Sequence, residues 1–313
     1  MEQKTTDIIY DIAIIGGGPA GLTAGLYAAR AGRSAVLIEE MLPGGQITKT
    51  NNVENYPGFE DVIEGAALAA KMEQQAQKAG LKIRYATVNG LSLEGELKRI
   101  DCGKKTFFAR AVILAMGAEP RKLGLAREDT LIGAGVSYCA TCDGAFFRGQ
   151  QVAVVGGGDT ALSDALYLAN VAQKVYVVHR RDTLRATQAL QDATKETENV
   201  EFILDCVPEA LMGSDRVEGL AVKSNKTGEV CQLPVGGVFV AVGITPRSAL
   251  VQGSVACDGN GYIKTDPYMR TNLPGVYAAG DVRLTPLRQL VTAAADGAVA
   301  ATAAAEYLMQ QGK

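Results

Sequence analysis

Two glycine-rich loops, GGGPAG at residues 16–21 and GGGDTA at residues 156–161, constrain the fold more than any other feature. Each loop follows a β-rich apolar run, opens a segment of helical composition and is followed by a second apolar strand. That second strand ends equally far beyond each loop, at Glu39 in the first half and at His179 in the second. A strand–turn–helix–strand unit of this kind is typical of a dinucleotide-binding half. Its repetition predicts two such units in one chain.

The remaining apolar patterns give each half an expected series of elements. The first half predicts strands at 8–15, 34–40 and 111–116, helices at 22–30 and 64–79, and an antiparallel ribbon within 81–110. The second half predicts strands at 151–155, 174–179 and 238–242, helices at 160–170 and 183–198, and a strand with a ribbon over 200–224. The last part of the chain holds only a strand at 276–279 and an Ala-rich helix at 287–309. These complete no third unit and are expected to finish the first.

The second half is therefore expected to be inserted into the first. We predict an α/β protein with two Rossmann-like domains of three-layer ββα architecture. One domain is discontinuous, with residues 1–120 and 246–313, and the inserted domain covers 121–245. Pro120 and Pro246 stand at the crossings, where the fixed φ of proline stiffens a linker.

Composition disfavours several other classes of protein. A net charge of −3 disfavours a nucleic-acid or anionic-membrane surface, and a single histidine excludes a multi-histidine metal site, so no metal is expected. Residues 12–29 are uncharged, but their glycines and Pro19 favour a strand, turn and helix over a membrane span. Asp7 and Asp11 replace the positive flank of a signal peptide, so we expect a cytoplasmic protein.

The first loop fits the G-x-G-x-x-G pattern of a pyrophosphate site. Gly16 makes the turn, Gly18 lets a phosphate approach the backbone, and Gly21 lets the helix pack on the strand. The following helix supplies N–H donors and the positive end of its dipole. Such a loop is often only a structural turn, but the flanking strand and helix, with Glu39 available for ribose hydroxyls, favour a nucleotide site.

The second loop keeps Gly156 and Gly158 and has Ala161 at the third position. The acid at the end of the next strand is replaced by a basic cluster of His179, Arg180, Arg181 and Arg185. A carboxylate would repel a ribose 2′-phosphate, whereas arginine binds it with charge-assisted hydrogen bonds. The second site is therefore expected to take NADPH rather than NADH, although arginines of this kind can also form a plain solvated face.

Cys139 and Cys142 form a C-x-x-C pair followed by Asp143. Two thiols at this spacing can close a disulfide with little chain movement, and a helix beginning near Cys142 would favour its thiolate. Asp143 is placed to exchange a proton with a leaving thiolate. A pair of buried reduced cysteines is the simpler alternative, but beside two nucleotide loops the pair favours redox chemistry.

Two glycine loops and a C-x-x-C pair in one chain resemble the low-molecular-weight, bacterial-type thioredoxin reductases, which are class II pyridine nucleotide-disulfide oxidoreductases. The resemblance covers essentially the whole length. It rests on GGGPAG at 16–21, GGQIT at 44–48, VENYPG at 53–58, CATCDG at 139–144, GGGDTA at 156–161, HRRDTLRA at 179–186, YAAGDV at 277–282 and RQLVTAAADG at 288–297. CATCDG between two nucleotide loops is the most specific of these motifs.

The resemblance implies two cofactors and places both. FAD would contact Gly16, Gly18, Pro19, Ala20, Gly21, Glu39, Gly45, Gln46, Asn55, Gly117, Gly280, Asp281, Arg288, Gln289 and Leu290. NADPH would contact Gly156, Gly158, Asp159, Thr160, Ala161, His179, Arg180, Arg181 and Arg185. By this resemblance 1–120 with 246–313 is the FAD domain, and 121–245 is the NADPH domain that carries the redox pair.

The resemblance also implies an activity, thioredoxin-disulfide reduction with electrons from NADPH through FAD. Cys142 would be the sulfur nearer the flavin, Cys139 the one that attacks thioredoxin, and Asp143 the proton donor or acceptor. Family members are homodimers in which the NADPH domain rotates. This chain departs from the family pattern at Met116, where threonine is usual, and at Ser163-Asp164, where two glutamates are frequent.

Other functions remain open at this point. The chain could act on another thioredoxin-like or glutaredoxin-like protein or on a small dithiol. A flavin oxidase closing a small dithiol would need no NADPH, which the arginines argue against. A peroxiredoxin-reducing flavoprotein would carry an extra N-terminal thioredoxin-like domain, for which Met1–Asp7 leaves no room. A nucleotide sensor without catalysis would have no use for Cys139 and Cys142.

Overall fold

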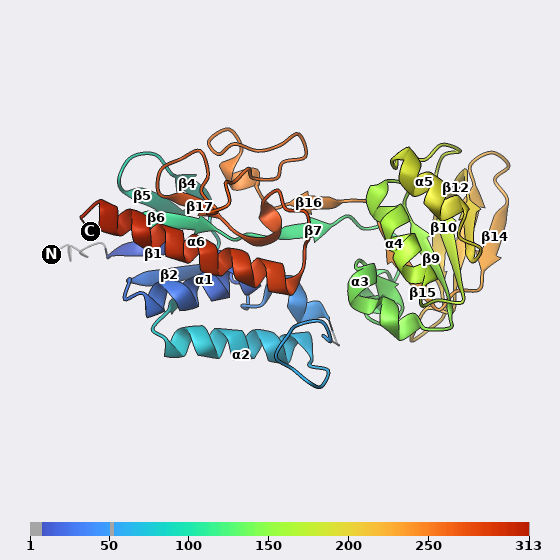
Figure 1. Ribbon diagram of the computed structural model, residues 1–313, viewed down its shortest axis with the longest axis horizontal. Coiled ribbons are helices and arrows are strands. Elements are labelled where there is room, and N and C mark those ends of the chain that lie inside the picture. The colour runs from blue at the N-terminus through green and yellow to red at the C-terminus, as the bar shows by residue number, and fades with distance from the viewer. Residues whose placement is uncertain (1–7, 51–52, 313) are drawn as a thin grey trace. The chain divides into compact units, whose positions relative to one another are not determined.

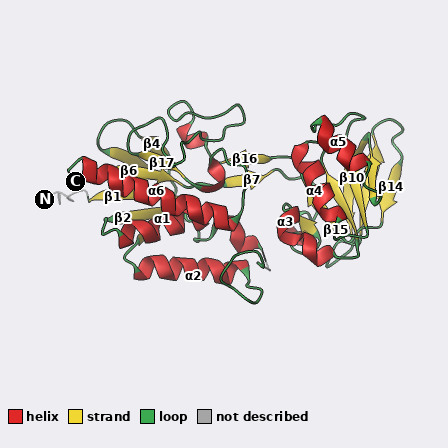
Figure 2. Cartoon of the chain, viewed as in Figure 1, coloured by secondary structure: helices red, strands yellow, loops and turns green. Residues whose placement is uncertain are grey.

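The computed structural model describes residues 8–50 and 53–312 and divides the chain into two compact units (Figure 1). Unit 1 joins the chain up to Glu119 with Thr245–Lys313, and unit 2 is the intervening segment, Pro120–Ile244. The second unit is thus an insertion in the first. Figure 2 shows helices and strands in both units, which confirms the predicted α/β class.

The sheet of unit 1 has a parallel core in the order β3(Lys82–Tyr85), β2(Ala35–Glu39), β1(Ile9–Ile15), β6(Lys105–Leu114), and β17(Val276–Ala278) also pairs with β6. Two antiparallel strands, β5(Lys98–Cys102) and β4(Gly90–Ser92), continue it from the first half of β6. The last strand, β17, comes from beyond the insertion, as the sequence predicts.

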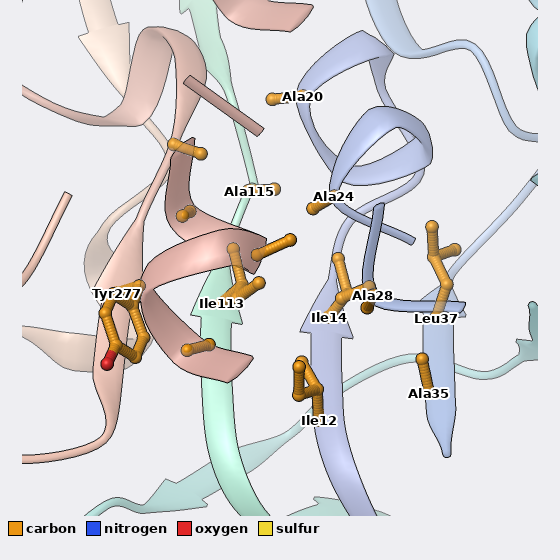
Figure 3. Packing of buried hydrophobic residues seen from close by; sticks show 14 of the residues in the cluster. Ile12, Ile14, Ala20, Ala24, Ala28, Ala35, Leu37, Ile113, Ala115 and Tyr277 are labelled. Carbon is orange, nitrogen blue, oxygen red and sulfur yellow. The ribbon is translucent and has the colours of Figure 1, made fainter. Parts of the chain in front are cut away.

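Helices α1(Pro19–Arg30), α2(Gly65–Lys78) and α6(Leu290–Gln310) pack on one face of this sheet. Figure 3 shows that face, where Ile12 and Ile14 of β1 meet the alanines of α1. Small residues let α1 and α6 approach closely: a Cβ on Gly297 would lie 2.1 Å from the carbonyl oxygen of Ala20. The uncharged run at 12–29 is therefore a buried strand, a turn and a helix.

Unit 2 repeats the order of the first four strands, and its edge strand comes from before the glycine loop rather than from the end of the unit. Its parallel sheet runs β11(Val200–Ile203), β10(Lys174–Val178), β9(Gln151–Val155), β15(Gly237–Val240), β8(Val136–Ser137). Helices α4(Asp159–Ala169) and α5(Gln188–Lys195) belong to one layer, and α3(Ala140–Asp143) precedes β9. The antiparallel sheet of β12(Cys206–Met212), β13(Gly219–Ser224) and β14(Val230–Leu233) packs on the opposite face. The layers are those of the predicted ββα architecture.

Three expectations for the elements were wrong in detail. Residues 82–85 form a parallel strand beside β2 rather than part of an antiparallel ribbon, because the chain leaves α2 alongside that strand. The predicted strand at 111–116 is the second half of one long strand, β6. The helix expected at 183–198 begins only at Gln188, because the preceding backbone is bonded to the glycine loop described below.

The two crossings between the units pair as a short ribbon of β7(Ala118–Pro120) and β16(Ile244–Pro246). The amide of Arg247 donates to the carbonyl of Gly117 at 3.0 Å, and the amide of Arg121 donates to that of Gly243 at 2.9 Å. Among the described residues, no helix has both the length and the apolar character that a membrane crossing requires.

Candidate active site

The first glycine loop excludes side chains at two positions and leaves a third open. A Cβ on Gly16, whose φ is +101°, would lie 2.5 Å from the carbonyl oxygen of Ala115, and a Cβ on Gly21 would lie 1.9 Å from that of Gly16. A Cβ on Gly18 would meet no atom within 4 Å. Gly16 and Gly21 are therefore required by the protein itself, whereas the space beside Gly18 is free for a ligand.

Glu39 ends β2 with both carboxylate oxygens oriented by the backbone. The amide of Gly17 donates to Oε2 at 2.6 Å and that of Met41 donates to Oε1 at 3.1 Å. These bonds fix the carboxylate beside the glycine loop. Its remaining lone pairs fit the hydroxyls of a ribose.

The segment after β2 folds back onto the same loop. The amide of Gly44 donates to the carbonyl of Gly17 at 2.7 Å, and a Cβ on Gly45 would lie 3.3 Å from the Cα of Gly18. The predicted Gly45 and the predicted Gly18 are thus neighbours.

Gln46 and Asn55 connect segments that are distant in the sequence. The Gln46 side-chain amide donates to the carbonyl of Ala118, next to the turn at Gly117. The Asn55 side-chain amide donates to Oε1 of Gln289 at 3.1 Å, just before α6 begins. Asn55 thus contacts another predicted residue, whereas Gln46 contacts the residue after the predicted Gly117.

A buried aspartate in α6, which the sequence analysis missed, holds the Gly280-Asp281 turn. The Asp296 carboxylate accepts the Gly280 amide at 3.1 Å and binds Arg283 through Nε at 2.6 Å and Nη2 at 2.8 Å. A two-pronged arginine–carboxylate pair of this kind is strong and geometrically specific. The sequence signal was an acid among the small residues of the Ala-rich helix, since a carboxylate that is buried there needs a partner.

Asp281 and Arg288 form the polar part of this region. Burial raises the pKa of Asp281, and the charge of Arg288 opposes that rise. The Arg288 guanidinium lies 4.3 Å from the centre of the Tyr262 ring, and its Nε is buried without a hydrogen-bond partner among the described residues. A buried arginine donor of this kind fits an anionic ligand such as a diphosphate. Leu290, the first residue of α6, packs on the neighbouring cluster around Val53.

The second glycine loop repeats the geometry of the first. A Cβ on Gly156 would lie 2.5 Å from the carbonyl oxygen of Ala241, and one on Gly157 would lie 2.3 Å from Nδ1 of His179. A Cβ on Gly158 would meet nothing within 4 Å. The first turn of α4 that follows contains the predicted Asp159, Thr160 and Ala161.

The basic segment after β10 is bonded directly to this loop. The carbonyl of Gly157 accepts the amides of Arg185 at 2.7 Å and Ala186 at 3.2 Å, and Oδ1 of Asp159 accepts the amide of Thr187 at 2.7 Å. Asp159 therefore anchors the basic segment. The glycine loop and the arginines form one connected structure.

The arginines of that segment are exposed, and none of Arg180, Arg181 and Arg185 forms an ion pair within the described ranges. His179 is only 6% exposed, and its Nε2 has no hydrogen-bond partner there. Burial lowers the pKa of His179, and a hydrogen bond to the Thr183 backbone opposes this effect. The charges of the nearby arginines lower the pKa further. The positive charge of the cluster is thus available to an anion.

Cys139 and Cys142 are joined in a disulfide with a Cα–Cα distance of 5.3 Å, and both residues are partly exposed. The helix α3 starts directly after Cys139, whose carbonyl accepts the amides of Cys142 at 3.2 Å and Asp143 at 3.1 Å. The expectation of a helix beginning near Cys142 is therefore confirmed, with the start two residues earlier, at Ala140. Cys139 is at the helix start, and Cys142 lies within the helix.

Asp143 is connected to the redox pair through a residue that the sequence analysis did not select. The Ser137 hydroxyl donates to Oδ2 of Asp143 at 2.6 Å and accepts the amide of Cys139 at 3.1 Å. Burial raises the pKa of Asp143, and the Ser137 hydrogen bond lowers it. In the sequence, Ser137 was marked only as a polar residue next to the apolar Val136 and Tyr138.

The remaining cysteines, Cys102, Cys206, Cys231 and Cys257, are free.

Comparison with known proteins decides the family. The family described as pyridine nucleotide-disulphide oxidoreductase matches residues 10–298. The chain belongs to this family. It is 47% identical over 301 residues to the thioredoxin reductase of Listeria monocytogenes, covering 96% of this chain and 94% of that protein. The thioredoxin reductase of Bacillus subtilis is 43% identical over 301 residues, covering 96% and 95%.

A solved structure of this pyridine nucleotide-disulphide oxidoreductase family supports the same assignment. The crystal structure of thioredoxin reductase from Streptococcus pyogenes superposes with a TM-score of 0.93 at 44% identity, over 97% of this chain and all of that one. The resemblance seen in the sequence motifs is therefore confirmed. As a member of this family, the chain is an oxidoreductase, and its Cys139–Cys142 disulfide lies in unit 2.

Proposed function

We propose that this oxidoreductase is an NADPH-dependent thioredoxin-disulfide reductase with FAD as its resident cofactor. The observation that carries the proposal is the disulfide of Cys139 and Cys142, beside Asp143, in the unit that also holds the second glycine loop and its exposed arginines. The thioredoxin reductases from Listeria and Streptococcus support it through their similarity over nearly the whole chain.

The residues of unit 1 fit FAD. Gly18 offers open backbone for the diphosphate, and Glu39 offers oriented oxygens for the adenosine ribose. Arg288 offers a buried Nε donor that has no hydrogen-bond partner in the part of the chain that the structure describes. Further contacts are proposed at Gly16, Pro19, Ala20, Gly21, Gly45, Gln46, Asn55, Gly117, Gly280, Asp281, Gln289 and Leu290.

The residues of unit 2 fit NADPH. Gly156 is required by the turn itself, and Gly158 leaves the loop backbone accessible to a phosphate. The exposed guanidinium groups of Arg180, Arg181 and Arg185 suit a 2′-phosphate, which NADH lacks. His179, Asp159, Thr160 and Ala161 complete the proposed site.

The chemistry follows from these groups. Bound flavin supplies a carrier that accepts a hydride from NADPH and passes electrons on in a form that a disulfide accepts. Two electrons break the Cys139–Cys142 bond, and Asp143 is placed to give a proton to one of the resulting thiolates. We assign attack on the thioredoxin disulfide to Cys139 and the resolving role to Cys142. A homodimeric, cytoplasmic enzyme is part of the same proposal.

Cysteine variants test this function. Oxidised protein carrying FAD is mixed without oxygen with NADPH or NADH, and the new thiols and the reduction of thioredoxin are measured. NADPH should be much more effective than NADH. Cys139→Ser and Cys142→Ser should each lose thioredoxin reduction while still oxidising NADPH with an artificial acceptor, because exchange needs both an attacking and a resolving thiol. Cys231→Ser, at an exposed free cysteine, is the control.

Two results would count against the proposal. Thioredoxin reduction retained in either of the first two variants would exclude the disulfide as the redox centre. Thiol formation without reduction of any thioredoxin, but with reduction of a glutaredoxin-like protein or a small disulfide, would assign the enzyme to another substrate.

A further inference from the structure

Ser137 occupies a position between the acid and the redox disulfide. It ends the short strand β8 and is 3% exposed. Its hydroxyl lies 2.6 Å from Oδ2 of Asp143, 3.1 Å from the amide of Cys139 and 3.3 Å from the Cys139 carbonyl. A hydroxyl has one proton, and the shortest contact, to the carboxyl group, is the one that takes it. The amide of Cys139 then donates to the same oxygen.

This arrangement connects two groups that must change charge together. When the disulfide opens, Asp143 is the partly buried acid in its vicinity, and the Cys139 backbone sets the position of the first sulfur. A buried hydroxyl is costly unless it is hydrogen-bonded, and Ser137 uses both its donor and its acceptor capacity here. Replacing it with alanine would leave the Cys139 amide and the Asp143 carboxyl without this partner.

We propose that Ser137 is a positioning residue for proton transfer at the redox centre: it stabilises the carboxylate form of Asp143 and fixes it relative to Cys139. The inference rests on the proposed function. In the step concerned, the hydride of NADPH supplies two electrons and a proton. The electrons, carried by the flavin, break the S–S bond, and the proton leaves to solvent. One sulfur takes the proton of Asp143 and becomes a thiol, and the other remains a thiolate. Asp143 becomes a carboxylate that accepts the hydrogen bond of Ser137.

The surroundings of Asp143 make the Ser137 bond its main polar contact. The elements that pack against α3 are the short helix η3(Gly144–Phe147), which carries no titratable side chain, and α4. The titratable residues of α4 are Asp159, Asp164 and Tyr167, and Tyr167 lies against Gly144. Asp143 forms no ion pair within the described ranges, and no neighbouring charge contributes to its pKa shift.

The test compares Ser137→Ala with Ser137→Thr, which keeps the hydroxyl, and with Ser163→Ala, an exposed serine of α4, as the control. The first measurement follows the Asp143 carboxyl carbon by ¹³C NMR in the oxidised protein, identified by its loss in Asp143→Asn. In Ser137→Ala this signal should titrate at higher pH, because a hydrogen bond to the carboxylate is lost. Ser137→Thr and Ser163→Ala should titrate like the parent protein.

The second measurement is the rate of thiol formation after mixing with NADPH, as a function of pH. Ser137→Ala should be about tenfold slower, the factor expected for loss of one charge-assisted hydrogen bond. The pH above which its rate falls should move upward, and Ser137→Thr should restore both. Near-ultraviolet circular dichroism checks the fold, and Ser137→Val, which has the shape of the threonine variant but no hydroxyl, replaces the alanine variant if that variant does not fold.

Two results would overturn the proposal. One is an Asp143 titration that is unchanged in Ser137→Ala. The other is a rate loss that is equal at every pH and is not restored by threonine, which would make Ser137 a packing residue only. The NMR titration needs neither NADPH nor thioredoxin. A parent protein that forms no thiols with NADPH would therefore refute the proposed function and leave the role of Ser137 to the titration.

Discussion

At the scale of single residues, Gly18 and Gly21 lack a side chain for opposite reasons. A Cβ on Gly21 would overlap the carbonyl of Gly16 at 1.9 Å, whereas a Cβ on Gly18 would point into open space. Gly21 serves the fold of the loop, whereas Gly18 is required only when a ligand lies against the backbone. The two substitutions to alanine therefore separate folding from cofactor binding.

Gly18→Ala should keep the stability of the flavin-free protein and retain much less flavin after purification. Gly21→Ala should lower the free energy of unfolding by about 2–3 kcal/mol, as expected for a buried overlap, and lose flavin as a consequence. Flavin absorbance and urea unfolding of the flavin-free proteins measure the two effects. A Gly18→Ala protein with full flavin content would show that the loop is only a structural turn.

At the scale of elements, helix α4 contains Asp164, a partly buried carboxyl whose charged form lowers the stability of the fold. Burial raises the pKa of Asp164 from 3.8 to about 6. A carboxyl whose pKa is higher in the folded than in the unfolded protein favours the folded state in its protonated form. The stabilisation of the fold by protonated Asp164 is therefore fully present below pH 3.8 and is lost as the pH rises through 6.

Asp164→Asn, which is neutral and similar in shape, should therefore stabilise the protein at neutral pH by about 1–3 kcal/mol. The gain should shrink on acidification and be small at about pH 4. Thermal unfolding of both proteins at the two pH values measures it, with the exposed Asp215→Asn as the matched control. A gain that is independent of pH would assign the effect to packing instead of charge.

At the scale of the whole molecule, the insertion leaves and re-enters unit 1 at neighbouring points. The strands β7 and β16 pair with each other, and the Arg247 amide is bonded to the Gly117 carbonyl. Unit 1 also has its own clusters of buried residues on both faces of its sheet. A short linker in place of residues 120–244 would therefore join ends that already lie together.

We expect unit 1 closed by a Gly–Ser linker to fold and to bind FAD, because the residues that fit the cofactor all belong to it. Circular dichroism and flavin absorbance of the purified fragment check this, with the same fragment carrying Gly18→Ala as the control. A folded fragment without flavin would show that residues of unit 2 complete the FAD site.

Local patterns predicted most of the elements, and long-range contacts explain the differences. The strand and helix around each loop are encoded within a few residues, so both glycine loops, Glu39 and the Cys139–Cys142 pair were found in the sequence. The bonds of Arg185 and Ala186 to Gly157 delay the start of α5, which no periodicity reveals. Asp296 was missed because its role depends on how the earlier turn at Gly280 folds back onto α6. Ser137 was missed because the local path of the chain around α3, which decides its partners, leaves no periodic pattern in the sequence.

The discontinuity of unit 1 also determines an order of events on the ribosome. Residues 120–244 are synthesised before β17 and α6, so unit 2 is complete while the sheet of unit 1 still lacks a strand and its Ala-rich helical cover. At about 5–20 residues per second, roughly 10–40 s separate the emergence of the first part of unit 1 from that of its last helix. During that interval, the part of α1 that α6 later covers lacks this cover in the nascent chain, and we expect chaperones to bind there.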